Sequence, residues 1–184
     1  MSERTDIRTG IATYFGGPTF DATYQIHRPT PLAAVGLGGV RTYMPVIVTG
    51  EDRMVGLAEG STMGAVMGVW LGESTEKRLT IGGTLDRPYD VHLMIWHLAL
   101  GPLTETAQAH VDDLVAAVVA RIRADPTLGM GVGSGSPTIV TQAGEGERGI
   151  TVSPGWPATE PGASPKTLQD AAISFSVNTY PNIA

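Results

Sequence analysis

Residues 89–126 join a strand pattern to a helix pattern, and this combination constrains the fold more than any other part of the chain. Alternate residues of the first segment are apolar and predict a strand with one buried face, formed by Tyr89, Val91, Leu93 and Ile95. After the Gly101-Pro102 break, helical spacing over residues 104–124 groups an apolar stripe: Val111, Leu114, Val115, Val118 and Ile122. Because such a stripe needs a surface to pack on, we expect the helix to lie on a sheet that contains this strand.

Shorter patterns predict the remaining elements. A helix should begin at Ser2 or Thr5 and end near Phe15. Strand-like runs occupy Ala22–His27, Val40–Val48, Met63–Leu71, Lys77–Thr84 and Ala172–Thr179. Pro45 lies inside the second of these runs, which indicates an edge strand or a bulge because proline cannot donate to a strand ladder.

The order of these segments predicts how they connect. Val40–Val48 and Met63–Leu71 are expected to form a long hairpin. Thr138–Ala143 and Gly149–Ser153 are expected to pair around the turn Gly144–Glu147. Two segments read as loops by composition, the glycine-rich residues 128–137 and the proline-rich residues 154–166.

Together these patterns predict one α+β domain spanning residues 1–184. Its mixed or antiparallel sheet would contain a long β-hairpin and would be packed by one main helix, about 104–124, and by a short N-terminal helix. The chain of 184 residues is long enough to bury a core, and its 24 glycines and 13 prolines imply many turns.

Charge and cysteine content exclude several classes of function. The formal net charge is −6 and no cluster of Lys and Arg is present, which disfavours sequence-independent binding of nucleic acid. The absence of cysteine excludes disulfides, thiolate nucleophiles and cysteine metal sites. The charged N-terminus is unlike a signal peptide, and the apolar stretches Gly64–Leu71 and Val91–Leu100 are too short to span a bilayer. We therefore expect a soluble protein with no membrane partner.

The candidate chemical motifs favour structural roles. Ser74 and Lys77 have the spacing of a serine–lysine pair, but a pattern with two fixed positions is common by chance. Four histidines are present, and His92 and His97 should point to opposite faces of one strand. No metal-binding spacing occurs among His27, His92, His97 and His110, so we expect satisfied or interface histidines.

Three other groups also carry an ordinary structural interpretation. Gly131–Ser136 follows a helix rather than a strand and lacks the end of a phosphate-binding loop. Asp112 and Asp113 are adjacent on the main helix and should form its solvated side. The tryptophans are expected to anchor the core or an interface: Trp70, Trp96 and Trp156. We thus predict a protein that is not an enzyme, with no catalytic, metal or cofactor site.

The order of elements resembles the tail terminator proteins of phages with long non-contractile tails, the lambda-type family. Two segments carry most of this likeness: the strand Tyr43–Val48, with its aromatic-x-Pro-hydrophobic pattern, and the strand–Gly-Pro–helix unit Asp90–Arg123. The likeness covers most of the chain but is one of pattern, without a signature motif. The proline-rich residues 154–166 depart from the family pattern.

The resemblance implies a subunit of a hexameric ring in the tail or neck of a virion, assembled in the host cytoplasm. The ring would cap the tail tube, terminate its polymerisation and join it to the head-closure or connector protein. Genome DNA would pass through the lumen without specific binding. Four acidic residues near one hairpin are expected to keep that lumen negative: Glu73, Glu76, Asp86 and Asp90.

Several alternatives remain open at this point. A head-closure or neck protein is one alternative within the virion. A tail-tube subunit is another, because tube proteins also use a sheet, one helix and a long hairpin, and it would stack on copies of itself. A small hydrolase would use Ser74 and Lys77 or a histidine. A ligand-binding domain would be a monomer with an apolar pocket. Oligomeric state distinguishes most of these readings.

Overall fold

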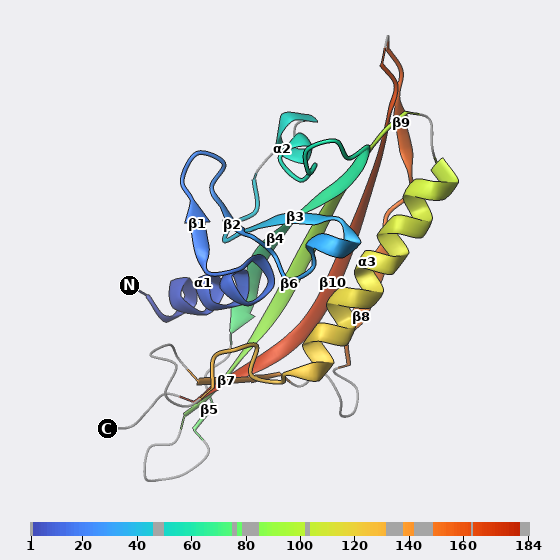
Figure 1. Ribbon diagram of the computed structural model, residues 1–184. Coiled ribbons are helices and arrows are strands. Elements are labelled where there is room, and N and C mark those ends of the chain that lie inside the picture. Colours follow the sequence, from blue (N-terminus) through green and yellow to red (C-terminus); the bar gives the residue numbers. More distant parts are fainter. Residues whose placement is uncertain are drawn as a thin grey trace.

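Two long antiparallel strands organise the computed structural model: β6 (Leu85–Leu100) and β10 (Lys166–Tyr180). They pair without interruption from Lys166 opposite Leu100 to Thr179 opposite Arg87 (Figure 1). The structure describes residues 2–45, 50–74, 77–78, 85–101, 104–131, 138–141, 149–162 and 164–180. Both strands are longer than the alternating apolar segments that predicted them. Backbone pairing between β6 and β10 continues beyond those segments.

The other strands complete a mixed sheet with the order β1-β2-β3-β4-β6-β10-β7. On one side of β6 lie β4 (Met63–Ser74), β3 (Leu37–Arg41), β2 (Ile26–Arg28) and β1 (Thr19–Asp21). The far edge of β10 pairs with three short strands, β7 (Thr138–Thr141), β8 (Thr151–Pro154) and β9 (Ala158–Glu160). A further short strand, β5 (Lys77–Arg78), pairs with the start of β6. The predicted α+β class is confirmed.

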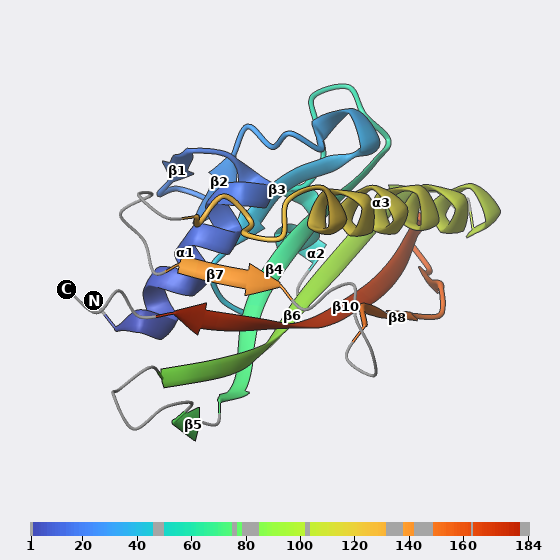
Figure 2. The ribbon, with the colours of Figure 1, turned by 90° about the horizontal axis from the view of Figure 1, so that it is seen from below.

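Two helices cover one face of this sheet, α1 (Glu3–Gly16) and α3 (Thr104–Ala124), as Figure 2 shows from below. The Ser2 hydroxyl caps α1 by accepting a hydrogen bond from the Thr5 amide. Tyr14 and Arg121 join the two helices, since the tyrosine hydroxyl donates to the Arg121 carbonyl at 3.0 Å and the guanidinium lies 4.2 Å from the ring centroid. The predicted helices at both positions are confirmed.

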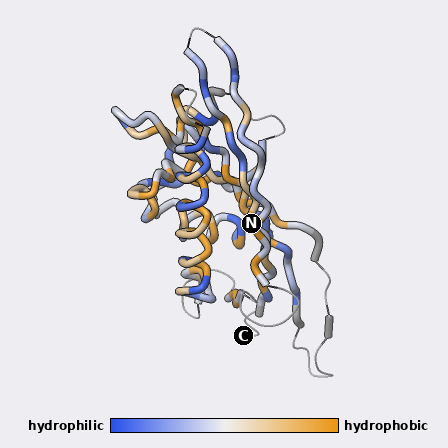
Figure 3. The backbone as a smooth tube through the Cα atoms, turned by 90° about the vertical axis from the view of Figure 1, so that its right-hand side faces the viewer, coloured by the Kyte–Doolittle hydropathy of each residue, from blue (hydrophilic) through white to orange (hydrophobic). Residues whose placement is uncertain are grey.

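The main core lies between these helices and the sheet. The α3 stripe is buried as its spacing predicted, and Figure 3 shows hydrophobic and hydrophilic positions alternating along that helix. From the sheet, the inward-facing residues of β4, β6 and β10 enter the same cluster: Met67, Val69, Val91, Leu93, Ile95, Ile173 and Phe175. Burial of this set is the largest favourable contribution to folding.

The opposite face of the sheet is covered only at one end. A small cluster of Ile26, Val66 and Trp96 is packed by Val55 and Met44, next to the five-residue helix α2 (Gly50–Met54). The short 3-10 helix η1 (Ala33–Val35) lies before β3. The remainder of this face retains exposed side chains, among them Trp70 on β4.

The expected hairpin between residues 40 and 71 is wrong. β3 and β4 are parallel, with α2 in the connection between them, and the long antiparallel hairpin is formed by β4 and β6 instead. The predicted strand Val40–Val48 ends at Arg41, residues 42–45 belong to no strand, and residues 46–49 lie outside the described part. Met44 instead packs into the small cluster, and Pro45 could not have extended the ladder.

Three other segment predictions are corrected. Residues 22–25 form the turn between β1 and β2. Of the expected strand 77–84, Lys77–Arg78 is a strand as predicted, and 79–84 lie outside the described residues. β7 and β8 each pair with β10 rather than with each other, and the turn 144–147 is outside the described residues. The segment 154–166 contains β9, because Ala158–Glu160 is free of proline and can pair with β10.

Candidate assembly surfaces

Large apolar side chains are exposed at three places on the described surface. They lie at the β1–β2 edge of the sheet, on or between the strands beside β10, and on the opposite sheet face, where one is on α2 and one on β4. The exposed residues are Phe20, Tyr24, Met54, Trp70, Val140, Val152 and Trp156. Exposed apolar groups that gather rather than scatter are typical of interaction surfaces.

The arm, defined as residues 151–160, carries the most exposed of these side chains. Trp156 is 94% exposed, although its neighbour Gly155 is tightly held against β10. The Gly155 amide donates to the Asp170 carbonyl at 2.7 Å, and the Gln169 side-chain amide donates to the Gly155 carbonyl at 3.3 Å. A Cβ atom at Gly155 would lie 2.6 Å from the Asp170 carbonyl oxygen, so glycine permits this close approach. The arm therefore presents an indole ring to solvent from an anchored backbone.

The lobe, defined as residues 19–28 with Arg41, Tyr43, Asp52 and Val55, contains a cavity of about 480 Å³. Polar and aromatic residues surround this lobe cavity: Thr23, Tyr24, Gln25, Arg41, Tyr43, Asp52 and Val55. The Arg41 side chain is 6% exposed and donates to Asp52 at 2.6 Å. Its guanidinium also lies 5.8 Å from the Tyr43 ring centroid. The lobe cavity thus combines a fixed cation with aromatic walls.

The turn in the lobe is shaped by one aspartate. Asp21 accepts hydrogen bonds from the amides of Thr23 and Tyr24 at 2.9 and 3.3 Å, which is an Asx-type turn. Desolvation would raise the pKa of Asp21, but these backbone hydrogen bonds and the adjacent Arg28 hold it below its ordinary value. Gln25 follows with φ of 54°, a left-handed conformation that is uncommon for a residue other than glycine. The turn places Tyr24 at the cavity rim.

A second cavity, of about 390 Å³, has His110 in its wall. His110 Nδ1 lies 3.0 Å from Nε2 of His97, which is fully buried on β6. Burial, reinforced by the nearby His110 and Arg53, lowers the pKa of His97 to about 4. Arg53 also donates to the His97 carbonyl and to Asp170 at 3.2 and 2.5 Å. This network joins α2, α3, β6 and β10 and fits a structural role.

The open face carries the other histidine of β6. His92 Nδ1 is 2.8 Å from the Ser174 hydroxyl oxygen, and the ring lies 4.8 Å from that of Trp70. Ser176 donates to Asp90 on the same face at 2.8 Å. Since His97 is buried beneath α3, the prediction that the two β6 histidines point to opposite faces is confirmed.

Other candidate residues are placed by the structure as follows. Ser74 ends β4 and Lys77 begins β5, and the side chains of both lie outside the described part. Asp112 and Asp113 are exposed on α3 as predicted. His27 is buried and its Nδ1 lies 3.3 Å from the Gly17 carbonyl oxygen. Among the side chains the structure describes, no group of three His, Cys, Asp or Glu is arranged to hold a metal.

The predictions for the glycine-rich segment 128–137 and for the four acidic residues can be compared with the structure only in part, because some of these residues or their side chains lie outside the described part. Within 128–137, Leu128 and Met130 are buried in the main core, and residues 132–137 lie outside the described range. Of the four acidic residues expected near the lumen, Asp90 is exposed. The side chains of Glu73, Glu76 and Asp86 are not among those described.

Sequence reasoning did not find the lobe cavity or the buried arginines. Arg41 meets Asp52 and Arg53 meets Asp170 across 11 and 117 positions, and no local spacing signals such pairs. For Trp156, the available signal was its position between Pro154 and Pro157, a segment where a core tryptophan is unexpected. Of the three tryptophans, Trp96 is buried and the other two are exposed.

Comparisons with known proteins do not assign a family. No protein-family model matches this chain, and no curated protein matches it in sequence. None of the helices in the described part of the chain has the length and apolar character needed to cross a membrane. The class of the protein is therefore given by its fold, an α+β domain with two exposed sheet edges of different character.

Proposed function

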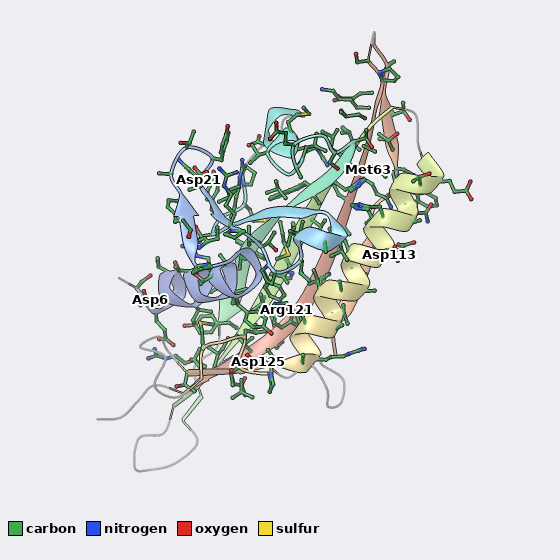
Figure 4. All side chains as sticks on the ribbon, viewed as in Figure 1. Asp6, Asp21, Met63, Asp113, Arg121 and Asp125 are labelled. Atoms are coloured by element: carbon green, nitrogen blue, oxygen red, sulfur yellow. The ribbon has the colours of Figure 1, made fainter. Side chains whose placement is uncertain are left out.

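We propose that this chain is a phage structural protein that forms a ring, capping the tail tube and ending its polymerisation. The observation that carries this proposal is the presence of different exposed apolar groups on opposite sides of the subunit. The lobe, at the β1 end of the strand order, exposes Phe20 and Tyr24. The arm, which pairs with β10, exposes Val152 and Trp156. In Figure 4, the label of Asp21 marks the lobe.

Unlike surfaces on opposite sides favour a head-to-tail contact. A two-fold dimer uses the same patch on both subunits, whereas a heterologous contact uses two different patches and generates a closed ring or an open filament. A subunit with a lobe on one side and an arm on the other carries the two different patches that a heterologous contact needs. Residues 43–45 form no strand, so the resemblance to lambda-type tail terminators is now carried by Asp90–Arg123. That resemblance supports a closed ring of about six subunits.

The charge of the chain is consistent with the rest of the proposal. A formal net charge of −6 with scattered basic residues disfavours adhesion to DNA, which suits a channel that the genome crosses without specific binding. The two ring surfaces would contact the tail-tube protein and the head-closure or connector protein. The site of action would be the tail or neck of the virion, after assembly in the host cytoplasm.

Size-exclusion chromatography with light scattering, followed by negative-stain imaging, tests this proposal. Discrete rings of about six subunits support a terminator. Open-ended tubes would instead assign the chain to the tail-tube subunits. A monomer at every concentration, with no binding to tail tubes, would overturn the ring proposal and leave a head-closure or ligand-binding protein.

A further inference from the structure

We infer that Trp156 of one subunit inserts into the lobe cavity of a second copy of this chain. The inference rests on the proposed ring and names the contact that closes it. The arm of each subunit would bind the lobe of the next. Every subunit would thus insert its Trp156 into one neighbour and accept Trp156 of the other neighbour in its own cavity. The partner is therefore this same chain, in a heterologous arrangement.

The first support is the state of Trp156 itself. A tryptophan that is 94% exposed leaves a large apolar area in water, which is unfavourable for an isolated subunit. Flexibility does not account for the exposure, because Gly155 is bound through both its amide and its carbonyl. Pro154 and Pro157 restrict the backbone on either side. An aromatic side chain on a held backbone loses less conformational entropy on binding than one on a mobile loop. Tryptophan is also enriched among the residues that dominate interface energies.

The second support is the chemistry of the lobe cavity. At about 480 Å³ it falls within the range of cavities that accept an aromatic group. The guanidinium of Arg41 is fixed by Asp52, and a cation held in place attracts the face of an indole more strongly than that of any other ring. Asp52 and Gln25 bring acceptor oxygens to the wall, which suits the single N–H donor of tryptophan.

The third support is the charge around each part. Arg28 lies over the ring of Tyr24, 5.3 Å from its centroid, and its side chain is 44% exposed and paired with Asp21. On the arm, the carboxylate of Glu160 is exposed four residues after Trp156. Docking the arm on the lobe would bring this anion toward the Arg28–Asp21 ion pair, where the guanidinium has further N–H donors for a second carboxylate. Complementary charges at the rim steer association and fix its register.

The contact cannot form within one subunit. The lobe cavity lies at the β1–β2 end of the sheet, whereas the arm pairs with β10, beyond β3, β4 and β6 in the strand order. Figure 1 shows β1 on one side of the molecule and the arm strands β8 and β9 on the other. Trp156 can therefore reach only the cavity of another molecule, and each addition leaves a new arm and a new cavity free.

Cysteine cross-linking tests the contact directly, because the native chain contains no cysteine. Subunits with Ala158→Cys on the arm, which keep Trp156, should form a disulfide-linked dimer under mild oxidation when they are mixed with subunits carrying Thr23→Cys in the cavity wall. The double variant should give a ladder that ends at the ring size. The matched control pairs Ala158→Cys with Trp70→Cys on the open sheet face, and this mixture should not cross-link above the level of random collision.

A second measurement uses the native ring. Trp156→Ala should raise the subunit concentration needed for ring formation by about 30-fold or more, as for an interface hot spot, while circular dichroism remains native. Trp70→Ala, which removes another exposed tryptophan, should leave ring formation unchanged. Rings that persist with Trp156→Ala at native concentrations, together with no selective cross-link, would overturn the inference and leave the ring proposal standing. A native chain that never forms rings and never binds tubes would instead overturn the proposed function, and with it this contact.

Discussion

The two faces of β6 differ in how completely they are buried, although both belong to one strand. Leu93 and Ile95 point toward α1 and α3 and are fully buried in the main core. His92 and Met94, their neighbours in sequence, are only partly buried on the opposite face. The difference teaches that the helices provide most of the stability on one side and leave the other side available for contacts.

The lengths of the covering elements explain this difference. α1 and α3 contain 14 and 21 residues and together cover one face, whereas α2 has five residues and covers only the region of Val66 and Trp96. A sheet face without a helix must be polar, be covered by a partner, or remain exposed. Trp70 and His92 lie in the part that α2 does not reach.

The largest effect is expected from a charge placed under α3. Val115→Asp should unfold the subunit, because burying an unpaired carboxylate in the core costs several kcal/mol, roughly 4 or more. Ala116→Asp is the matched control, since Ala116 is the next residue and is exposed. Urea unfolding followed by circular dichroism distinguishes them. A folded Val115→Asp protein would mean that the helix-covered face is not the stabilising one.

A smaller effect is expected from a comparison within β6. Leu93→Ala should lower the free energy of unfolding by about 2–5 kcal/mol, as is typical when a fully buried leucine is truncated. Met94→Ala, on the partly covered face, should lower it by less than about 2 kcal/mol. Thermal and urea unfolding of both variants measure the difference. Equal losses would contradict the unequal burial of the two faces.

Local patterns were sufficient to predict the main elements. Each of these two elements buries one face, so its apolar residues recur with the period of a strand in β6 and of a helix in α3. Such a period can be seen in the sequence. Pairing between strands was harder to predict. The Val40–Leu71 hairpin was wrong because strand direction depends on the α2 connection, and nothing in the strand residues distinguishes parallel from antiparallel neighbours.

The candidate surfaces were only partly predictable for a related reason. The lobe cavity forms where three separate segments meet, around Gln25, Arg41 and Asp52, and no single window of sequence contains it. The exposure of Trp156 depends on the way Gly155 docks on β10, which is a tertiary contact. Side chains whose role comes from one element are predictable, whereas those whose role comes from several elements are not.

The buried histidine gives the helix-covered face a dependence on pH. The pKa of His97 is lowered from 6.5 to about 4 in the folded state, chiefly by desolvation, so the unfolded state binds more protons between these values. The contribution of His97 to the free energy of unfolding should therefore be constant above pH 6.5 and should decrease as the pH falls toward 4. The total loss from this group is about 3 kcal/mol at most.

Urea unfolding at several pH values measures this slope, with His97→Gln as the variant that removes it. Burial also lowers the pKa of His27, so a smaller slope of the same sign should remain in the variant. An identical pH dependence in native and variant proteins would show that His97 is accessible to protons in the folded state. That result would weaken the contrast between the two faces of β6.

The smallest effect on stability is expected on the open face. Trp70 is 46% exposed, and its main described contact is the ring of His92 at 4.8 Å. Trp70→Ala should therefore lower the free energy of unfolding by about 1 kcal/mol, well below the 3–5 kcal/mol typical of a buried tryptophan. Trp96 lies on the same face but is packed by Val55, so Trp96→Ala should show the larger loss in the free energy of unfolding. Thermal unfolding of the two variants compares the open and covered parts of one face. Equal losses would indicate that Trp70 is packed as tightly as Trp96, and the open face would then belong to the core rather than to a surface for partners.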